Sequence, residues 1–470
     1  MLRKVWLLAL CLVLGACGEV SEVTVDAGEG VGEDAGEPSC AAGEFLSCLD
    51  AETARVCKED GSGVEEISCG HCSEELEACT ECEPSTEQCV GDELVLCGDA
   101  GDVEQSTNCD LGCLDPGEAD PRCGVLTPTN LTEDFCSQPV GNDEPIVGDI
   151  DTDEDCDTVI IQDEGPEICV LRRDDAYIPN GDIRVTGERA LAIAATSSLV
   201  LEGRIDASAE GSTGGPAASE LGIGETAGND KGAGGGGYAT GGAPGGTVDE
   251  AGAGGEGGDA YGNVELEPLR GGSRGGDIPA GNAANPLDHG GGGGAVQLVS
   301  CGELTISPQG KVHVGGGGGR GGGGSEGGGG GGGSGGAILV EAVSLQVQGI
   351  LAANGGGGGA GSCPERADGR GLNGADADAS EQPASGGGPC VIVLETVDVS
   401  STDSGGSGGA GGAAESAPSA GDETSFSDGG PGAGGGAAGR IRLNVGPGST
   451  MDITNAVVSP DPSEGAVHVR

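Results

Sequence analysis

Residues 337–353, which read AILVEAVSLQVQGILAA, decide the fold class of this 470-residue chain. Apolar residues alternate here with polar or small ones, and this period of two predicts β-strands. Gly349 marks a turn before a third, brief strand. The stretches 190–207 and 295–314 follow the same plan, and weaker copies lie around 390–399 and 440–458. Repeats of this kind predict a parallel β-solenoid, in which each coil covers the apolar face of its neighbour.

A glycine-rich excursion follows each clear repeat, over residues 208–294, 315–336 and 354–388. Excursions that leave successive coils at the same corner must emerge on one face of the solenoid. Residues 315–336 are almost entirely Gly but lack the strict Gly-X-Y period of collagen. Two arrangements stay open. The excursions are either flexible coils or extended left-handed polyglycine strands whose backbones hydrogen-bond directly, an approach that only Gly permits and that its conformational entropy opposes.

The composition excludes a conventional large hydrophobic core and several classes of partner. The chain contains 103 Gly and only 1% aromatic residues, too few large side chains to fill such a core. Its formal net charge of −58 repels nucleic acid and anionic membrane surfaces, and it attracts divalent cations or basic partners. We therefore expect no nucleic-acid partner, and we expect most of the charge to solvate the surface.

The first 16 residues are organised as a secretory signal. Arg3 and Lys4 precede an apolar run over 5–13, which is too short to span a membrane, and the tetrapeptide LGAC then ends at Cys17. This tetrapeptide resembles the lipobox of bacterial lipoproteins. The resemblance implies cleavage before Cys17 and acyl chains, such as palmitate, on that residue, so that the N-terminal lipid is the membrane anchor.

The residue after Cys17 is Gly18, not the Asp that retains some lipoproteins at the inner membrane. The lipobox resemblance therefore implies the outer membrane or the cell surface. Residues 17–39 lack periodic apolar positions and are rich in Gly, Ala, Asp and Glu, which predicts an acidic flexible tether.

Twelve cysteines form a tandem repeat, with one unit at 40–79 and a second at 82–123. In the first unit, the sequence Cys-Gly-His-Cys at 69–72 is compatible with a redox dithiol, a zinc site or disulfides. The equivalent pair of the second unit, at 109 and 113, has three intervening residues, so a redox or zinc pair does not recur. Small exported modules with little core are stapled by disulfides, which we therefore predict here, with the connectivity open.

The predicted disulfide cysteines share these two repeats or lie close to another cysteine in the sequence. They are Cys40, Cys48, Cys57, Cys69, Cys72, Cys79, Cys82, Cys89, Cys97, Cys109, Cys113 and Cys123, with Cys156–Cys169 and Cys363–Cys390 as local bridges. Cys136 and Cys301 have no predicted partner. The repeat spacing resembles that of Cys-rich, Gly-rich surface lipoproteins of myxobacteria, a family whose role is unassigned, so the resemblance implies no activity.

The acidic junction at 124–167 offers one candidate metal site. Asp153, Asp155, Asp157 and Glu164 occupy positions 1, 3, 5 and 12 of a calcium-loop pattern, and calcium binds such clustered oxygens. Thr158 stands where the loop needs Gly, and strand-like residues follow it. The alternative is a solvated acidic turn beside a Cys156–Cys169 hairpin. Apart from this structural calcium, we expect no cofactor.

The G-x-S-x-G motifs around Ser273, Ser325, Ser334 and Ser407 follow from the abundance of Gly. A nucleophile elbow needs a strand-to-helix turn and a partner His, and neither accompanies these serines. We therefore expect a non-catalytic, lipid-anchored cell-envelope protein with an adhesive or structural role. The sequence does not specify its protein or polysaccharide partner.

Two other functions stay open. Exported β-solenoids often cleave acidic polysaccharides, but such enzymes use aromatic platforms, and few aromatic residues follow position 165. The second alternative is a periplasmic scaffolding lipoprotein, because nothing in the sequence reports which side of the outer membrane the protein faces.

Overall fold

The structure is a computed structural model. It describes residues 40–115, 117, 120–228, 230–248, 252–278, 288–323, 327–363, 369–389, 405–425 and 429–470. The signal segment, Cys17, the tether, Ser325 and the weak repeat copy at 390–399 lie outside the described residues. The chain divides into two compact units between Pro84 and Ser85. Both consist mainly of β-strands and irregular extended segments, and the described residues include one short 3-10 helix, η1 (Phe135–Ser137).

The first unit contains the first cysteine repeat. Its strands are β1 (Phe45–Asp50), β2 (Thr53–Cys57) and β3 (Val64–Ser68) in one antiparallel sheet, and β4 (His71–Ser73) with β5 (Ala78–Thr80) in a second. Disulfides join Cys40 to Cys57, Cys48 to Cys72 and Cys69 to Cys79. These bonds link the first cysteine to the third, the second to the fifth and the fourth to the sixth, all within the predicted unit.

The second cysteine repeat has the same plan. Its strands are β6 (Glu87–Val90), β7 (Glu93–Cys97) and β8 (Val103–Asn108) in an antiparallel sheet, followed by β9 (Cys113–Leu114) and β10 (Arg122–Cys123). Disulfides join Cys89 to Cys113 and Cys109 to Cys123, again second to fifth and fourth to sixth. Cys82 and Cys97 each form a disulfide as well. The repeat in cysteine spacing is therefore a repeat in strand order and pairing.

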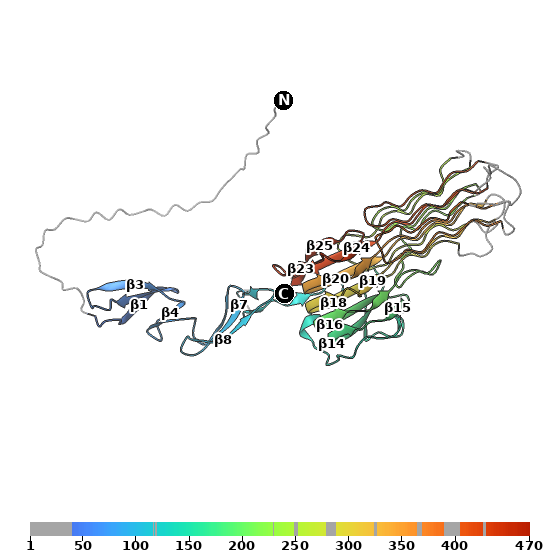
Figure 1. The fold of residues 1–470 in the computed structure, drawn as a ribbon. Helices are drawn as coiled ribbons and strands as arrows, with labels where there is room; N and C mark the ends of the chain where they lie inside the picture. Colours follow the sequence, from blue (N-terminus) through green and yellow to red (C-terminus); the bar gives the residue numbers. More distant parts are fainter. Residues whose placement is uncertain are drawn as a thin grey trace, which may run out of the picture. The chain divides into compact units, whose positions relative to one another are not determined.

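Two parallel sheets form the centre of the second unit (Figure 1). The larger sheet has the order β13 (Thr158–Ile160), β14 (Ile168–Ile178), β16 (Ala190–Leu201), β18 (Ala295–Ile306), β20 (Ala337–Val347), β22 (Arg440–Val445) and β25 (Ser463–Ala466), with β23 (Met451–Asp452) beside β20. The smaller sheet has the order β12 (Ile150–Asp151), β15 (Asp182–Thr186), β17 (Arg204–Asp206), β19 (Lys311–His313), β21 (Ile350–Ala352) and β24 (Val457–Ser459). Only β13 pairs antiparallel to its neighbour.

Both faces of the larger sheet are buried along the first halves of β16, β18 and β20. On β20, Ile338 and Val340 face the smaller sheet and pack with Ile205 and Leu351 in one apolar core. The alternate residues, such as Leu339, belong to a second core on the outer face of the larger sheet. Strands covered on both sides read as nearly continuous apolar runs, which explains the composition of 337–347.

The strands differ from the sequence prediction in one respect. The two short strands expected in each repeat are one long strand, interrupted by a register shift, as between Ser300 and Glu303 of β18. The shift accommodates an extra residue without ending the strand. The short strand after each Gly turn then joins the smaller sheet, as β21 does after Gly349.

The acidic junction contributes to the sheets and does not merely link two domains. It supplies β12 to the smaller sheet and β13 to the larger one, and β11 (Leu126–Thr127) pairs with β26 (His468–Val469) near the C-terminus. Cys136, which had no predicted partner, is bonded to Cys301 of β18. The segment around 126–136 is thus fixed across the outer face of the larger sheet, where Leu126 and Phe135 are buried.

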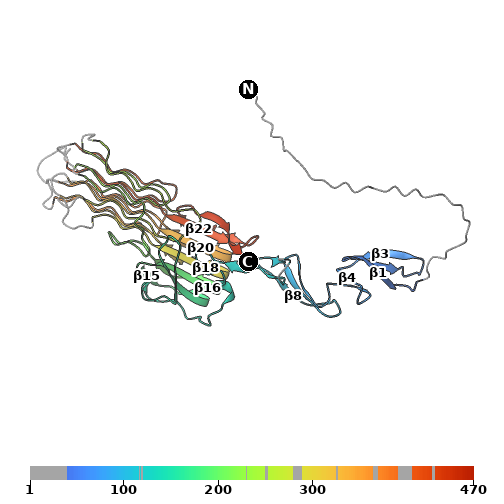
Figure 2. The ribbon, with the colours of Figure 1, turned by 180° about the vertical axis from the view of Figure 1, so that it is seen from behind.

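The glycine-rich excursions are ordered. We call the described parts of 208–294, 314–336 and 353–439 the glycine layer. Its segments run out beside one another from the strands of the two sheets, as Figures 1 and 2 show. Successive residues of 327–336 donate backbone hydrogen bonds of 2.8 to 3.1 Å to three neighbouring segments in turn: Gly329, Gly332 and Gly335 to 431–437, Gly330, Gly333 and Gly336 to 314–320, and Gly331 and Ser334 to 273–276.

Donors that change direction with a period of three residues are typical of an extended left-handed helix with three residues per turn. Segment 355–361 repeats it, with donors that point in turn to 406–412, 330–333 and 372–375. Segment 316–322 has backbone acceptors in only two directions, and side chains supply the third. Asp376 accepts the N–H of Gly318 at 2.7 Å, and Asn373 accepts that of Gly321 at 3.0 Å. Of the two arrangements left open by the sequence, the structure has the hydrogen-bonded one.

Close approach, not turn geometry, requires Gly in this layer. The glycines of 327–336 keep φ outside the left-handed region. A Cβ on Gly333 would lie 1.9 Å from the carbonyl oxygen of Gly291, far inside van der Waals contact. Around 327–336 the interior of the layer therefore consists mainly of backbone, with small residues such as Ala433 and Ala437 at a few positions.

Candidate functional site

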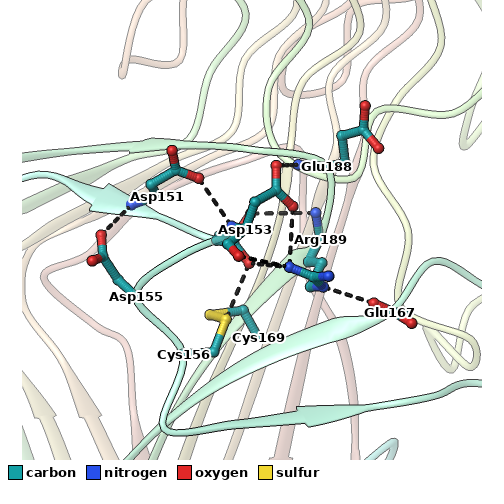
Figure 3. Close-up of polar contacts among 9 residues, drawn as sticks. Asp151, Asp153, Asp155, Cys156, Glu167, Cys169, Glu188 and Arg189 are labelled. Atoms are coloured by element: carbon teal, nitrogen blue, oxygen red, sulfur yellow. Dashed lines mark hydrogen bonds and ion pairs between the residues drawn. A yellow bond between two sulfur atoms is a disulfide. The ribbon is translucent and has the colours of Figure 1, made fainter.

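The carboxylates proposed to bind calcium are engaged with other partners (Figure 3). Asp153 accepts the backbone N–H of Glu188 at 3.0 Å, and its other oxygen lies 3.3 Å from Nη1 of Arg189. Asp155 accepts the N–H of Asp151 at 2.7 Å. These two carboxylates therefore satisfy backbone donors and an arginine on different sides of the loop after β12.

Arg189 organises this loop. Its Nη1 donates to the carbonyl oxygens of Thr152 at 3.2 Å and Asp153 at 3.1 Å, and its Nε lies 2.7 Å from Oε2 of Glu167. The hydrogen bond to Glu167 raises the pKa of the guanidinium. A positive charge is thus held against the acidic loop by Asp153 and Glu167.

The other two candidate ligands lie elsewhere. Asp157 accepts the N–H of Arg172 at 2.7 Å and pairs with Nη1 of Arg173 at 2.9 Å. Glu164 occupies a turn with φ of 58°, and its carbonyl oxygen accepts a hydrogen bond from Arg270. The described residues contain no group of three or more His, Cys, Asp or Glu side chains that could hold a metal ion. These contacts form an ion-paired turn that the bridge between Cys156 and Cys169 closes, and calcium binding at this loop stays a prediction.

Two serines of the G-x-S-x-G motifs, Ser273 and Ser334, form hydrogen bonds within the glycine layer. Ser273 is fully buried, and its Oγ lies 2.8 Å from the carbonyl oxygen of Gly222 and 2.6 Å from that of Gly237, so that one of them accepts its proton. Ser334 is also fully buried, and its Oγ accepts the N–H of Ser273 at 2.8 Å. These hydroxyls complete backbone hydrogen bonding, so the motifs around them do not form nucleophile elbows.

A charged cluster lies on the smaller sheet where it meets the glycine layer. Asp206 of β17 has Arg204 Nη2 at 2.9 Å, Arg184 Nη1 at 3.3 Å, His313 Nδ1 at 3.3 Å and the Ser208 hydroxyl at 2.6 Å. Burial alone raises the pKa of Asp206. Hydrogen bonds from His313 and Ser208 and the charge of Arg204 outweigh burial and hold this pKa well below its usual value.

This cluster holds neighbouring strands together. His313 of β19 is 3% exposed and lies 3.0 Å from Nη2 of Arg204, and Arg184 of β15 also donates to the carbonyl oxygen of Ser208 at 2.7 Å. Three successive strands of the smaller sheet are therefore connected through one carboxylate. Ser208 donates its hydroxyl to this carboxylate and not to His313, an arrangement that does not activate a nucleophile.

Charges inside the glycine layer are paired in the same way. Asp277 lies 2.6 Å from Nδ1 of His289 and 2.9 Å from Nη1 of Arg274. Asp288 is 1% exposed, and its Oδ1 lies 3.3 Å from Nη1 of Arg320. Burial raises the pKa of Asp288. The pairs connect adjacent segments of the layer.

A second buried cluster lies on the outer face of the larger sheet. Glu341 of β20 is fully buried and accepts four hydrogen bonds: from the N–H and the hydroxyl of Thr129, from Nε2 of Gln297 and from Nδ2 of Asn444. Burial raises the pKa of Glu341, and the hydrogen bonds from Thr129, Asn444 and Gln297 oppose this effect. The strands bring Asn444 directly opposite Glu341.

One groove with a volume of about 380 Å³ lies at the C-terminal edge of the larger sheet. Its walls include Glu415, Asp461 and the prolines 418, 460 and 462, and none of its lining residues is aromatic. Arg440, which also lines it, donates to the carbonyl oxygens of Gly262 at 2.8 Å and Ala239 at 3.2 Å. The groove therefore lacks the aromatic platform on which sugar rings usually stack.

With this geometry in view, we compared the chain with known proteins, and no family model, curated protein or solved structure matches it. Within the described part of the chain, no helix has the length and apolar character needed to cross a membrane.

Sequence reasoning missed both buried clusters. Asp206 and His313 are separated by more than a hundred residues, so only the parallel pairing of β17 with β19 brings them together. Glu341 did carry a signal, because it is the single charged residue in the apolar run 337–347. A lone carboxylate on a strand that is buried on both faces needs partners, and those partners lie on other strands.

Proposed function

We propose that this protein is a non-catalytic cell-envelope protein, anchored to the outer membrane or cell surface through a lipid on Cys17, with an adhesive or structural role. The observation that carries the proposal is the glycine layer. A body whose interior is backbone hydrogen-bonded in three directions has few side-chain groups available for chemistry. Its dense network of backbone hydrogen bonds suits a protein that bears load or holds a surface in place.

The fold that supports this role is a parallel β-solenoid. In this proposal β14 with β15, β16 with β17, β18 with β19 and β20 with β21 are successive coils, each giving one strand to each sheet. The parallel register between the long strands of neighbouring coils supports it, as does the matching register in the smaller sheet. A stack of coils is extended and stiff, and it can lengthen without changing its cross-section.

The cysteine repeats support an exported location. Small disulfide-rich modules are typical of oxidising compartments outside the cytoplasm. The repeats lie between the tether and the two sheets in the sequence. The proposal therefore orders the chain as lipid, flexible tether, stapled repeats and a stiff distal body.

The anchor is tested by replacing the lipidated cysteine. Cys17→Ser should move the protein from the membrane fraction to the soluble fraction, because the lipid is its sole membrane affinity. Cys11→Ser, in the apolar run of the signal, is the matched control and should stay with the membranes. A Cys17→Ser variant that still sediments with outer membranes would remove the lipid from the proposal.

The side of the membrane and the role are tested on intact cells. External protease should degrade the protein, and cells without it should lose adhesion or matrix cohesion that the wild-type gene restores. Complete protection from protease, with degradation only after the outer membrane is opened, would favour a periplasmic scaffold instead.

A further inference from the structure

Thr129 and Gln297 meet on one buried carboxylate. The hydroxyl of Thr129 donates to Oε1 of Glu341 at 2.7 Å, and Nε2 of Gln297 donates to Oε2 of the same residue at 2.8 Å. Nε2 of Gln297 also lies 2.6 Å from the carbonyl oxygen of Thr129. An alcohol and a carboxamide are therefore held against one carboxylate, and the carboxamide also touches the backbone of the residue that carries the alcohol.

Solvent is excluded from this cluster. Gln297 and Glu341 have no exposed surface, and Thr129 is 7% exposed. Oε1 of Gln297 is buried and has no hydrogen-bond partner. A buried amide carbonyl without a donor is costly, whereas an ester carbonyl is a weaker acceptor and loses less on burial. The site therefore disfavours the free carboxamide relative to an ester at the same position.

We propose that Thr129 and Gln297 become joined by an intramolecular ester bond, formed after folding with Glu341 as the proton-transfer group. The Thr129 Oγ attacks Cδ of Gln297 while Glu341 takes the hydroxyl proton. The resulting tetrahedral intermediate collapses with cleavage of the Cδ–Nε2 bond, and Glu341 returns its proton to the departing nitrogen. The products are the Thr129–Gln297 ester and one molecule of ammonia, with no oxidant, metal or other reactant.

Each contact of Glu341 fits its part in this reaction. One oxygen touches the proton that must leave, and the other touches the nitrogen that must receive it. Asn444 donates to Oε1 at 3.2 Å, and Asn444 is itself fixed by Nε of Arg442 at 2.8 Å, so the carboxylate is held in place. Burial raises the pKa of Glu341, which makes its carboxylate a better base.

The ester would reinforce a connection that a disulfide already makes. Cys136 is bonded to Cys301, and these residues lie close in sequence to Thr129 and Gln297 respectively. Reduction opens the disulfide but not an ester. The segment across the outer face of the larger sheet would thus stay attached under reducing conditions. This inference does not depend on the proposed adhesive role.

The test is a peptide map of the full-length protein, purified and then completely reduced and alkylated. Trypsin releases Thr129 in the peptide 123–172 and Gln297 in the peptide 275–311. Since Cys136 and Cys301 lie in the same two peptides, reduction must be complete. We expect a joined pair whose mass is the sum of the two peptides less one ammonia. Alkaline hydroxylamine should separate the pair, because it cleaves esters and leaves amides intact.

Variants separate the chemistry from the fold. Thr129→Ala and Glu341→Gln should each abolish the joined pair, whereas Thr129→Ser, which keeps a hydroxyl, should retain it. Thr127→Ala is the matched control and should also retain it. If a variant fails to fold, the wild-type map still decides. Two separate wild-type peptides at their full calculated masses would overturn the proposal, as would a joined pair that resists hydroxylamine or persists in Thr129→Ala.

Discussion

The two sheets and the glycine layer both pair their backbone N–H and C=O groups in hydrogen bonds, but they fill their interiors in opposite ways. In the sheets each strand bonds to its neighbours in one plane, and apolar side chains such as Ile338 and Leu351 fill the space between planes. In the glycine layer inner segments such as 327–336 bond to neighbours in three directions, and little space remains there for side chains. One region thus depends on side-chain burial, and the other depends on the absence of side chains.

The comparison shows that hydrophobic content alone is a poor guide to order in this chain. The apolar run at 337–343 and the glycine run at 327–336 are both buried at every residue. Gly loses more conformational entropy on ordering than any other residue. The sheets hold both ends of each excursion, as β19 and β20 do for 314–336, so the segments do not order independently.

The largest expected effect comes from placing charge in the sheet core. Leu345 and Val347 are 2% and 1% exposed and face the smaller sheet. Replacing both with Asp should unfold the second unit, because two unpaired buried carboxylates cost several kcal/mol, about the whole stability of a domain. Thermal unfolding followed by circular dichroism checks this. Gln348→Glu, half-buried on the same stretch, is the control and should remain folded.

If the double variant melts like the wild type, the sheets do not carry the stability of this unit. The sheets would then not depend on the burial of their apolar side chains.

A smaller effect is expected from adding one methyl group to the glycine layer. Gly333→Ala would place a Cβ 1.9 Å from the carbonyl oxygen of Gly291 and 2.5 Å from its carbonyl carbon. Because both are backbone atoms, segments must separate, and we expect a loss of about 1–3 kcal/mol or more. Urea unfolding measures this loss, and hydrogen exchange at Gly291 and Gly317 should quicken.

Gly388→Ala is the matched control. The nearest atom to its added Cβ is a side-chain carbon of Leu372, at 3.8 Å, and its φ is not left-handed. This variant should be neutral or more stable by about 0.4–1 kcal/mol, since Ala restricts the unfolded chain. Equal effects at Gly333 and Gly388 would mean that the layer is not closely packed.

The smallest effect concerns the boundary between the two regions, at Asp206. Since its pKa is held below the usual 3.8, the folded state favours the ionised form, and the stabilisation is fully present above pH 3.8. Asp206→Asn should lower stability by about 0.5–1.5 kcal/mol at neutral pH. The difference from wild type should shrink as pH falls below 3.8, as the wild type loses its advantage.

Urea unfolding at a series of pH values measures this difference. Asp461→Asn, at an exposed position, serves as the control and should change stability by less than about 0.5 kcal/mol at each pH. A deficit in Asp206→Asn that stays constant down to the lowest pH would show that the hydrogen bonds of Asp206 do not depend on its charge.

Much of the strand pattern was readable from the sequence because period-two alternation is a local signal. The stretches at 190–207, 295–314 and 337–353 all become parallel strands, and Gly349 is a turn between two of them. The cysteine repeat was equally readable, since its spacing recurs. Its pairing order was not, because six cysteines allow many connectivities and only the fold selects one.

The other features depend on contacts between distant parts of the chain. A glycine run has the same composition whether it is flexible or packed, so 327–336 gave no local signal of its order. The calcium pattern at 153–164 could not show that Arg189, which lies further along the chain, pairs with Asp153 and Glu167. The cluster around Glu341 needed the register of β18, β20 and β22 before its partners were known.

The backbone interior of the glycine layer has a consequence for the response to temperature. Apolar surface exposed on unfolding raises the heat capacity, whereas polar surface lowers it, and hydrophobic stabilisation weakens on cooling. The glycine layer buries mostly peptide groups, so its unfolding adds little or negative heat capacity. The free energy of unfolding of the second unit should accordingly vary less with temperature than that of a globular domain of the same length. The glycine layer should lose less stability on cooling than a hydrophobic core does.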